Sequence, residues 1–460
     1  MADAQALVAG LPEERLQEWV LEQRWFASKA REVAHFGVLE AVTLREEAPK
    51  LVLALIEARF HTGTHELYQL PLGLRADDEA WDQRVIAEVE GWTVYDALAD
   101  PAQNHELLAR IGASEEVQGE HGVLHFRASE QAAARFDRTA AVRPIGVEQS
   151  NSSVVFGDQL ILKVFRRLEP GVNPELELLR FLSAREFPHI APLVGWYAYT
   201  GRLMDTTLGT LQVFLSGARD GWALCLDDLE GFLPEARALG VVTGELHTAL
   251  GSDVGDPDFA PEEPSMENLS LLTATVDEEI ERMFVDLDTE SPALAPLAGH
   301  AQDVRERLQA LSHIGTGGRL IRTHGDYHLG QTMLTDRGWV VLDFEGEPAR
   351  PLPERRRKRS PLRDVAGMLR SFAYAASAAE QQRGEPAPEG WEDHARSAFL
   401  EGYFEAVDAS LLPPGQDAVS KLLSVFELEK AVYELRYELN HRPDWIGIPV
   451  AGIVRLLEDA

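Results

Sequence analysis

One short segment in the last third of the chain constrains the fold more than any other. It begins with a polar loop, His324-Gly-Asp-Tyr-His328, in which Asp326 is the central carboxylate. A turn at Thr335-Asp-Arg-Gly338 follows, and the apolar run Trp339-Val-Val-Leu342 after it is typical of a β-strand. Asp343 closes that run. We therefore expect a loop, a hairpin and a carboxylate at the end of a strand.

The polar residues of this segment have the identities and spacing that phosphoryl transfer requires. The reaction needs a carboxylate to orient the attacking hydroxyl group, and oxygen ligands to hold Mg²⁺ against the phosphates. Asp326 fits the base, while Gln331, five residues later, and Asp343 fit the metal ligands. A protein kinase has Asn in place of Gln331 and Asp-Phe-Gly in place of Asp343-Phe-Glu345. The alternative is a hairpin with solvated acids in its loops.

A second pattern predicts a nucleotide-binding hairpin. Lys163 lies in the apolar run Leu160–Phe165, where an ammonium group is unfavourable unless it finds partners. The acidic helix that follows supplies Glu177 as the expected partner and Glu175 as the alternative, as for the phosphate-binding lysine of kinases. The other interpretation is an edge-strand lysine that buries only its aliphatic stem.

Two stretches on either side of this hairpin are expected to complete a nucleotide site. The polar loop before it lacks the glycines of a glycine-rich loop, but its groups could donate hydrogen bonds to phosphates. The strand Thr207–Leu215 would end at a hinge that binds adenine through backbone groups, which makes Val213 and Leu215 candidates. The candidates in the polar loop are Ser150, Asn151, Ser152 and Ser153.

The C-terminal helix Ala418–Asn440 carries ionic and aromatic side chains on adjacent stripes. This pattern suits a sugar site, because acids bind hydroxyl groups and rings stack on sugar C–H faces. The alternative is a salt-bridged helix that packs through its tyrosines. The side chains concerned are Glu427, Lys430, Tyr433, Glu434, Tyr437 and Glu438.

Composition limits the class of protein. The 460 residues include 76 acidic and 43 basic residues, and the net charge of −33 repels nucleic acid and anionic membranes. The single cysteine, Cys225, excludes an intrachain disulfide and agrees with a reducing compartment. We expect no signal peptide and no membrane span, and therefore a cytoplasmic protein that binds neither nucleic acid nor membranes.

The basic run Arg355–Arg359 is conspicuous on such an acidic chain. It could bind a nuclear import receptor or an anion, and its position after Asp343 favours a surface loop near the nucleotide or an acidic neighbour. Asp364 is expected either to cap the next helix or to anchor the loop around Asp326. His247 is expected to pack or to form hydrogen bonds, not to catalyse.

Together these motifs resemble those of actinobacterial maltokinases, which belong with the aminoglycoside phosphotransferases and eukaryotic-like kinases. The resemblance implies a bilobal, protein-kinase-like α+β fold, with an N-terminal α+β cap over residues 1–135, a nucleotide-binding lobe over 136–215 and a helical lobe over 216–460. The resembling segments are Gln23–Ala27, Glu148–Phe156, Leu162–Arg167, Gly171–Glu177, His324–Gln331, Asp343–Pro348, Ser360–Gly367, Lys430–Glu434, Tyr437-Glu438 and Arg442–Trp445.

The resemblance implies transfer of phosphate from ATP, with Mg²⁺, to the anomeric hydroxyl group of maltose. The product, maltose 1-phosphate, would feed α-glucan synthesis and link trehalose to glycogen metabolism, and an association with trehalose synthase is implied. Lys163 would hold the phosphates, Glu177 would position it, Asp326 would be the base, and Gln331 and Asp343 would bind Mg²⁺. The candidates on the sugar side are His324, Glu345, Lys430, Tyr433, Glu434, Tyr437 and Trp445.

The acceptor is the part of this assignment that the sequence leaves open. Tyr327 stands where the family often has Leu, and we expect it to narrow or reshape the acceptor pocket. A related branch phosphorylates glucosamine, whose ammonium group Glu434 and Glu438 could bind. The third hypothesis is a pseudokinase that serves as a binding module. Such proteins usually lose the base or a metal ligand, and this chain keeps the whole set.

Overall fold

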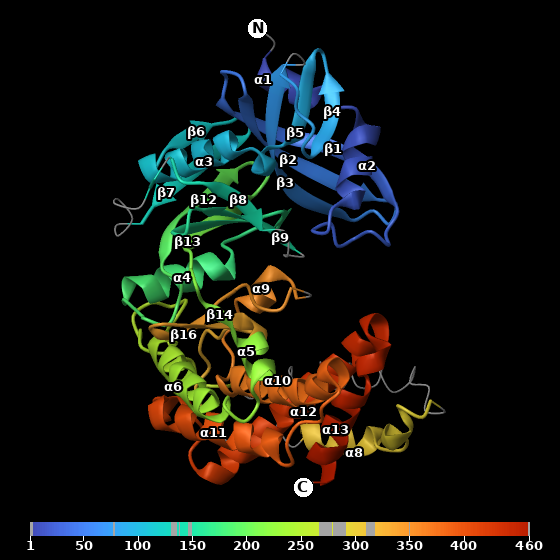
Figure 1. Cartoon of the computed structure of the whole chain (residues 1–460), viewed down its shortest axis with the longest axis vertical. Coiled ribbons are helices and arrows are strands. Elements are labelled where there is room, and N and C mark those ends of the chain that lie inside the picture. Colours follow the sequence, from blue (N-terminus) through green and yellow to red (C-terminus); the bar gives the residue numbers. More distant parts are fainter. Residues whose placement is uncertain are drawn as a thin grey trace. The chain divides into compact units, whose positions relative to one another are not determined.

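The structure is a computed structural model that describes residues 3–76, 79–129, 136–137, 139–145, 150–265, 278, 291–309, 318–348 and 350–458. Glu148 and Gln149, at the start of the polar loop, lie outside the described residues. The chain forms two compact units, Met1–Ser183 with Ala191–Ser216, and Ala184–Ile190 with Gly217–Ala460. Figure 1 labels most of the elements of both.

An antiparallel sheet organises the first half of the first unit, with the strand order β1-β2-β3-β5-β4 and β11 beside β3. The inner strand β2 of this sheet is an apolar run that is buried on both faces. Val52 and Ile56 pack against the helices α1 (Ala4–Ala9) and α2 (Glu13–Glu22), while Leu53 and Leu55 face a second core. The strands are β1 (Val33–Arg45), β2 (Lys50–Phe60), β3 (His65–Ala76), β4 (Val85–Val89), β5 (Trp92–Asp96) and β11 (Arg167–Leu168).

A second antiparallel sheet carries Lys163 and has the order β6-β7-β12-β13-β10-β9-β8. The hairpin expected around Lys163 is confirmed, because β9 pairs with β10 in the register Lys163↔Ser153. This sheet begins before residue 136, and the division of the chain into three parts stays a prediction. Its strands are β6 (Glu116–Gln118), β7 (Gly122–Ala128), β8 (Val142–Ile145), β9 (Asn151–Phe156), β10 (Leu160–Phe165), β12 (Leu193–Gly201) and β13 (Asp205–Val213), with the helices α3 (Pro101–Ala113) and α4 (Pro174–Ala184).

The second unit is mostly helical and holds a small sheet of the order β14-β15-β16. Glycines allow α6 and α11 to pack backbone against backbone, since a Cβ atom on Gly240 would lie 2.0 Å from the Phe399 carbonyl oxygen. The elements are β14 (Arg219–Asp220), α5 (Gly221–Asp227), α6 (Leu233–Leu250), α8 (Ala301–Gln309), β15 (Thr332–Thr335), β16 (Gly338–Val341), α9 (Leu352–Arg355), α10 (Leu362–Arg383), α11 (Trp391–Ala406), α12 (Gln416–His441) and α13 (Gly447–Glu458).

The longest of these helices, α12, buries four glutamates, Glu427, Glu429, Glu434 and Glu438. Buried carboxylates need partners, and neighbouring segments supply arginines for all four. In the part of the chain that the structure describes, we find no helix with the length and apolar character to cross a membrane.

Candidate active site

The loop that carries Asp326 is held in place by Asp364, near the start of α10. The Asp364 carboxylate accepts hydrogen bonds from the backbone N–H groups of His324, at 2.7 Å, and Gly325, at 2.9 Å. His247 Nε2 lies 3.2 Å from it. Burial raises the pKa of Asp364, but His247, His324 and the N–H hydrogen bonds lower it by more. The pKa therefore lies below its usual range, and the carboxylate stays ionised. Anchoring of the loop by Asp364 and hydrogen bonding by His247 are thus confirmed.

His324 joins this loop to the end of the strand before Asp343. Its ring Nε2 lies 2.8 Å from the Leu342 carbonyl oxygen, and its Nδ1 accepts a hydrogen bond from the Asp326 N–H at 3.3 Å. The side chain is only 1% exposed. Both ring nitrogens are therefore used inside the protein, and the expectation that His324 binds sugar is corrected. It is a positioning residue.

Asp326 faces a cation that comes from α12. The Nζ atom of Lys430 lies 3.3 Å from Asp326 Oδ1, and about a quarter of each side chain is exposed. Burial raises the pKa of Asp326, but Lys430, His328 and His324 outweigh it, so the pKa lies below its usual range. The pKa of Lys430 is raised, because Asp326, Glu347 and Glu434 outweigh its burial. At neutral pH Asp326 is thus a carboxylate that can accept a hydrogen bond from a hydroxyl group.

The two expected metal ligands lie side by side. Gln331 Nε2 donates a hydrogen bond to Asp343 Oδ2 at 3.1 Å. The hairpin explains this, because the pair Thr332↔Val341 places the residues at the outer ends of β15 and β16 together. Asp343 has the left-handed φ of 59°, which Asp tolerates better than most residues. A rotated Gln331 amide would present its oxygen beside the carboxylate, and such hard oxygen ligands fit Mg²⁺.

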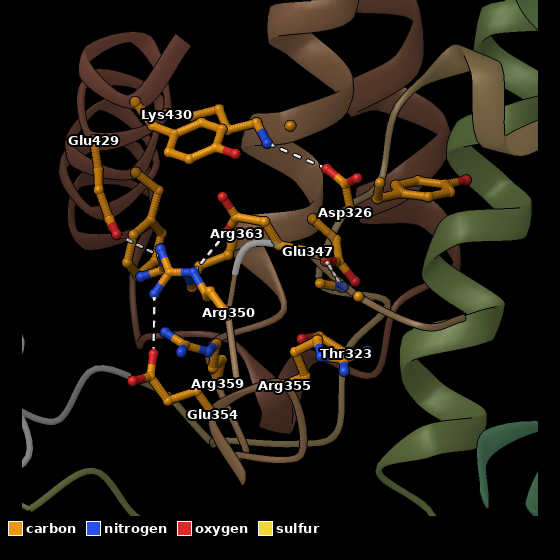
Figure 2. Close-up of a pocket in the computed structure, with 17 residues that line it drawn as sticks. Thr323, Asp326, Glu347, Arg350, Glu354, Arg355, Arg359, Arg363, Glu429 and Lys430 are labelled. Carbon is orange, nitrogen blue, oxygen red and sulfur yellow. Dashed lines mark hydrogen bonds and ion pairs between the residues drawn. The ribbon is translucent and has the colours of Figure 1, made fainter. Parts of the chain in front are cut away.

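A cavity of about 70 Å³ opens beside Asp326 within the second unit, as Figure 2 shows. Its wall comes from the Asp326 loop, the segment after Asp343, and the helices α9, α10 and α12. Close packing of Gly325 against Gly346 shapes it, since a Cβ atom on Gly325 would lie 3.4 Å from the Gly346 Cα. The lining residues are Thr323, Gly325, Asp326, Tyr327, Gly346, Glu347, Arg350, Glu354, Arg355, Arg359, Arg363, Asp364, Gly367, Phe426, Glu429, Lys430 and Tyr433.

Two of the expected sugar-side residues, Lys430 and Tyr433, line this cavity together with Asp326. Lys430 Nζ lies 5.1 Å from the centre of the Tyr433 ring. Glu347, which the sequence did not single out, forms an ion pair with Arg350 at 2.5 Å and a hydrogen bond with Tyr433. Burial raises the pKa of Glu347, but Arg350 and Lys430 outweigh it and keep the group ionised. The only feature of the sequence that could have indicated a role for Glu347 was its position shortly after Asp343.

The two acidic candidates on α12 form ion pairs within the protein. Glu434 pairs with Arg370, at 2.9 Å, and Glu438 with Arg442, at 2.7 Å. Burial raises the pKa of Glu434 even though Arg370 and Lys430 oppose it. The expectation that Glu434 binds the sugar is therefore wrong. The same holds for the expectation that Glu434 or Glu438 binds an ammonium group. This part of α12 follows the alternative interpretation of a salt-bridged helix.

Three further candidates lie outside the lining of this cavity, and their sugar roles stay predictions. Tyr437 is 41% exposed and stacks on His441 with ring centres 4.5 Å apart. Trp445 stacks on Tyr374 with centres 6.1 Å apart. The Glu345 carbonyl oxygen accepts a hydrogen bond from Arg355 at 3.1 Å.

Tyr327 lines the cavity, but its hydroxyl group points into the protein. The phenol oxygen lies 2.9 Å from Thr243 Oγ1 on α6, and the residue is 2% exposed. Burial raises the pKa of this phenol, so it stays protonated. The expectation that Tyr327 reshapes the pocket is therefore limited to the edge of its ring and its backbone.

In the first unit, Lys163 forms its ion pair with Glu175. The Nζ atom lies 2.8 Å from Glu175 Oε2, and Gln212 Nε2 donates to the other carboxylate oxygen at 2.8 Å. Helix residues two positions apart do not share a face, so a helix that turns Glu175 to Lys163 turns Glu177 elsewhere. The preference for Glu177 is corrected in favour of the alternative. Gln212 was missed, because strand residues carry no signal of their partners.

The polar loop contributes fewer exposed groups than expected. Ser150 is exposed, whereas Asn151 and Ser153 are buried in β9. Ser152 accepts a hydrogen bond from Arg166 Nε at 2.8 Å. At the expected hinge, the Val213 N–H donates to the Pro192 carbonyl oxygen at 3.0 Å, which removes this donor from any contact with adenine. The cofactor roles of the four loop residues, of Val213 and of Leu215 stay predictions.

Comparison with known proteins matches both parts of the chain. Residues 19–100 match the maltokinase N-terminal cap domain, and residues 141–400 match the phosphotransferase enzyme family. A glucosamine kinase of Streptacidiphilus jiangxiensis is 27% identical over 336 residues, which cover 69% of this chain and 74% of that protein. Another glucosamine kinase, of Mycolicibacterium smegmatis strain ATCC 700084 / mc(2)155, is 29% identical over 337 residues, which cover 69% of this chain and 80% of that protein.

Solved structures show the same fold. A glucosamine kinase in complex with glucosamine, ADP and inorganic phosphate has a TM-score of 0.73 at 20% identity, covering 99% of each chain. Crystal form B of a glucosamine kinase has a TM-score of 0.74 at 20% identity and covers 99% of this chain and 100% of that chain. The expected kinase-like α+β fold with an N-terminal cap is confirmed.

Proposed function

The chain belongs to the phosphotransferase enzyme family, and from this we propose that it transfers the γ-phosphoryl group of ATP to a sugar hydroxyl group. The observation that supports this most directly is the ionised carboxylate of Asp326 on the wall of a polar cavity. It would accept the proton of the attacking hydroxyl group. Lys430 would keep Asp326 ionised and, with Tyr433, would orient the sugar.

Two sets of residues have proposed roles in nucleotide binding. Lys163, oriented by Glu175 and Gln212, would bind phosphate oxygens of ATP. Gln331 and Asp343 would hold Mg²⁺, which when bound neutralises charge on the phosphates. Leu215 would bind adenine through its backbone. Within the described residues, this set retains the parts that a pseudokinase usually lacks.

We propose maltose as the acceptor and maltose 1-phosphate as the product. The match of residues 19–100 to the maltokinase cap domain supports this. The commitment of Glu434 and Glu438 to arginines supports a neutral sugar as well, because neither acid is available for an ammonium group. A cytoplasmic role in α-glucan synthesis and an association with trehalose synthase belong to the same proposal and rest on the resemblance to maltokinases.

Glucosamine is the second candidate acceptor, because two relatives of this chain are glucosamine kinases. Its ammonium group would need a carboxylate in the cavity. Glu347 lines the cavity and is ionised, but its charge is already balanced by Arg350. Glucosamine binding would therefore compete with an existing ion pair.

The proposal is tested by measuring ADP release from ATP and Mg²⁺ with maltose, glucose, glucosamine and an aminoglycoside in parallel. Phosphorus NMR and acid lability of the product then identify the phosphorylated hydroxyl group. A preference for maltose with an acid-labile anomeric phosphate supports the proposal. A preference for glucosamine supports the second candidate, and ADP release that no sugar stimulates contradicts both.

A further inference from the structure

Four arginines line the same cavity as Asp326, and all of them come from the segment between Asp343 and the first turn of α10. They are Arg350, Arg355, Arg359 and Arg363. In the view of Figure 2, Arg350, Arg355 and Arg359 lie together below Asp326 and Lys430. Neither a neutral sugar nor the ammonium group of glucosamine requires four guanidinium groups for binding. The proposed acceptors therefore do not explain this part of the cavity.

The acids of the cavity wall are already matched to other cations or donors. Arg350 lies 2.5 Å from Glu347 and 3.7 Å from Glu354. Arg363 lies 2.6 Å from Glu429 of α12. Asp326 faces Lys430, and Asp364 accepts hydrogen bonds from the backbone N–H groups of the loop that carries Asp326. Each of these carboxylates therefore has a partner other than Arg359.

Arg359 is a cation of the cavity lining for which the described part of the chain shows no such ion pair. The backbone of Arg359 forms reciprocal hydrogen bonds with Ile321, at 2.8 and 2.9 Å. Ile321 lies just before the loop that carries Asp326. Its guanidinium group forms no hydrogen bond or ion pair with any residue that the structure describes. Burial, followed by the charges of Arg363 and Arg350, lowers the pKa of Arg359 to about 10. The group is still charged at neutral pH. Glu429 and Glu354 favour this charge from a distance, but among the described contacts each of them pairs with another arginine.

We propose that Arg350, Arg359 and Arg363 form an anion subsite that binds the phosphate group of a sugar phosphate, or inorganic phosphate. Planar guanidinium groups donate pairs of hydrogen bonds that match phosphate oxygens. A phosphate dianion has enough acceptors to serve several of them at once, whereas a sugar hydroxyl group offers a single acceptor oxygen. The anion takes the partnerless guanidinium group as its main contact.

The inference rests on the proposed function in one respect, the placement of the acceptor beside Asp326. Because the subsite and Asp326 line one cavity, a bound phosphate occupies the acceptor side. Phosphate and the sugar phosphate product should then inhibit the enzyme competitively with respect to the acceptor sugar. Binding itself requires no turnover, so it can be measured even if the proposed reaction is wrong.

The test is isothermal titration of the full chain with inorganic phosphate and, separately, with glucose 1-phosphate, without nucleotide or Mg²⁺ and at constant ionic strength. We compare the wild type with Arg359→Gln and with the control Arg357→Gln. Arg357 belongs to the same basic run but is exposed and does not line the cavity. Arg359→Gln should weaken binding by about tenfold to a hundredfold, as expected for a charge-assisted hydrogen bond. Arg357→Gln should bind as the wild type does.

The two titrations also separate the possible sources of the anion. Tighter binding of glucose 1-phosphate than of inorganic phosphate identifies a sugar phosphate as the ligand, and equal or weaker binding identifies inorganic phosphate. Circular dichroism and the melting temperature confirm that both variants are folded. If the wild type binds neither ligand, or if folded Arg359→Gln binds as tightly as the wild type, the subsite is refuted. Sugar-dependent ADP release in that case would leave the proposed function intact.

Discussion

Asp326 and Lys430 approach to 3.3 Å from segments far apart in the chain. Their pKa values move in opposite directions, that of Asp326 downward and that of Lys430 upward, because each stabilises the charged form of the other. At the scale of single residues, this pair sets the protonation state of the proposed base.

Asp326→Asn should lower turnover by about 10²- to 10⁴-fold, the usual contribution of a general base. ATP binding should change little, because Lys163 and the expected metal ligands remain. Steady-state rates of ADP release and a nucleotide titration measure the two effects. Asp336→Asn is the matched control, since Asp336 is exposed in the turn between β15 and β16. Wild-type turnover of Asp326→Asn would refute the assignment of the base.

Lys430→Met should shift the acidic limb of the pH profile of kcat/KM to higher pH. The activity needs ionised Asp326, so it is lost as the pH falls through the pKa of this group. Removing the cation raises that pKa, and the loss then begins at higher pH. The control is Lys421→Met, because Lys421 lies on the same helix and is 71% exposed. An unchanged acidic limb in Lys430→Met would show that the two groups are not coupled.

At the scale of elements, the phase of α4 decides which acid serves Lys163. The first turn of this helix presents Glu175, which also accepts a hydrogen bond from Gln212 of β13. A helical face repeats every three to four residues, so Glu175 and Glu177 cannot both face the sheet. The hairpin of Lys163, by contrast, depends only on neighbouring residues and was predictable from the apolar runs on either side of the Gly157-Asp158 turn.

Glu175→Gln should raise the KM for ATP by about tenfold, because a charged hydrogen bond to Lys163 is lost. Glu177→Gln is the matched control, with the same chemical change two residues along the helix, and should leave the KM for ATP within about twofold. Initial rates at varied ATP concentration distinguish the variants. A larger effect of Glu177→Gln than of Glu175→Gln would restore the assignment made from the sequence.

At the scale of the whole molecule, a buried ion pair joins the two regions that match known families. Asp96 lies within the match to the cap domain, and Arg166 lies within the match to the phosphotransferase family. Their side chains are fully buried with the charged atoms 2.7 Å apart. Arg166 also donates to Ser152 in β9, so the pair links the cap sheet to the hairpin that carries Lys163.

Asp96→Asn should lower the free energy of unfolding by about 3–5 kcal/mol, because Arg166 loses its buried counter-ion. Urea unfolding followed by near-ultraviolet circular dichroism measures the change. Asp82→Asn, at an exposed position of the same cap region, is the control and should fall within about 0.5 kcal/mol of the wild type. Equal stability of the two variants would show that the cap does not depend on this pair.

The sequence alone predicted the parts of this protein that depend on residues close together in the chain. The hairpin between Gln331 and Asp343 and the strand around Lys163 follow from local patterns, because turns and β-pairing over short loops restrict the chain to few conformations. That Asp326 lies in a loop before this hairpin was predictable for the same reason, whereas its role as the base stays a proposal. The fold class followed from the resemblance of several such motifs to one family.

Only the tertiary structure decided which charged groups meet. Whether Lys163 takes Glu175 or Glu177 depends on the rotation of a helix against a sheet. The inward pairing of Glu434 with Arg370 depends on how distant segments pack, and so does the absence of a partner for the Arg359 side chain among the described residues. Electrostatic energy changes steeply with separation and burial, and neither quantity can be read from residue spacing.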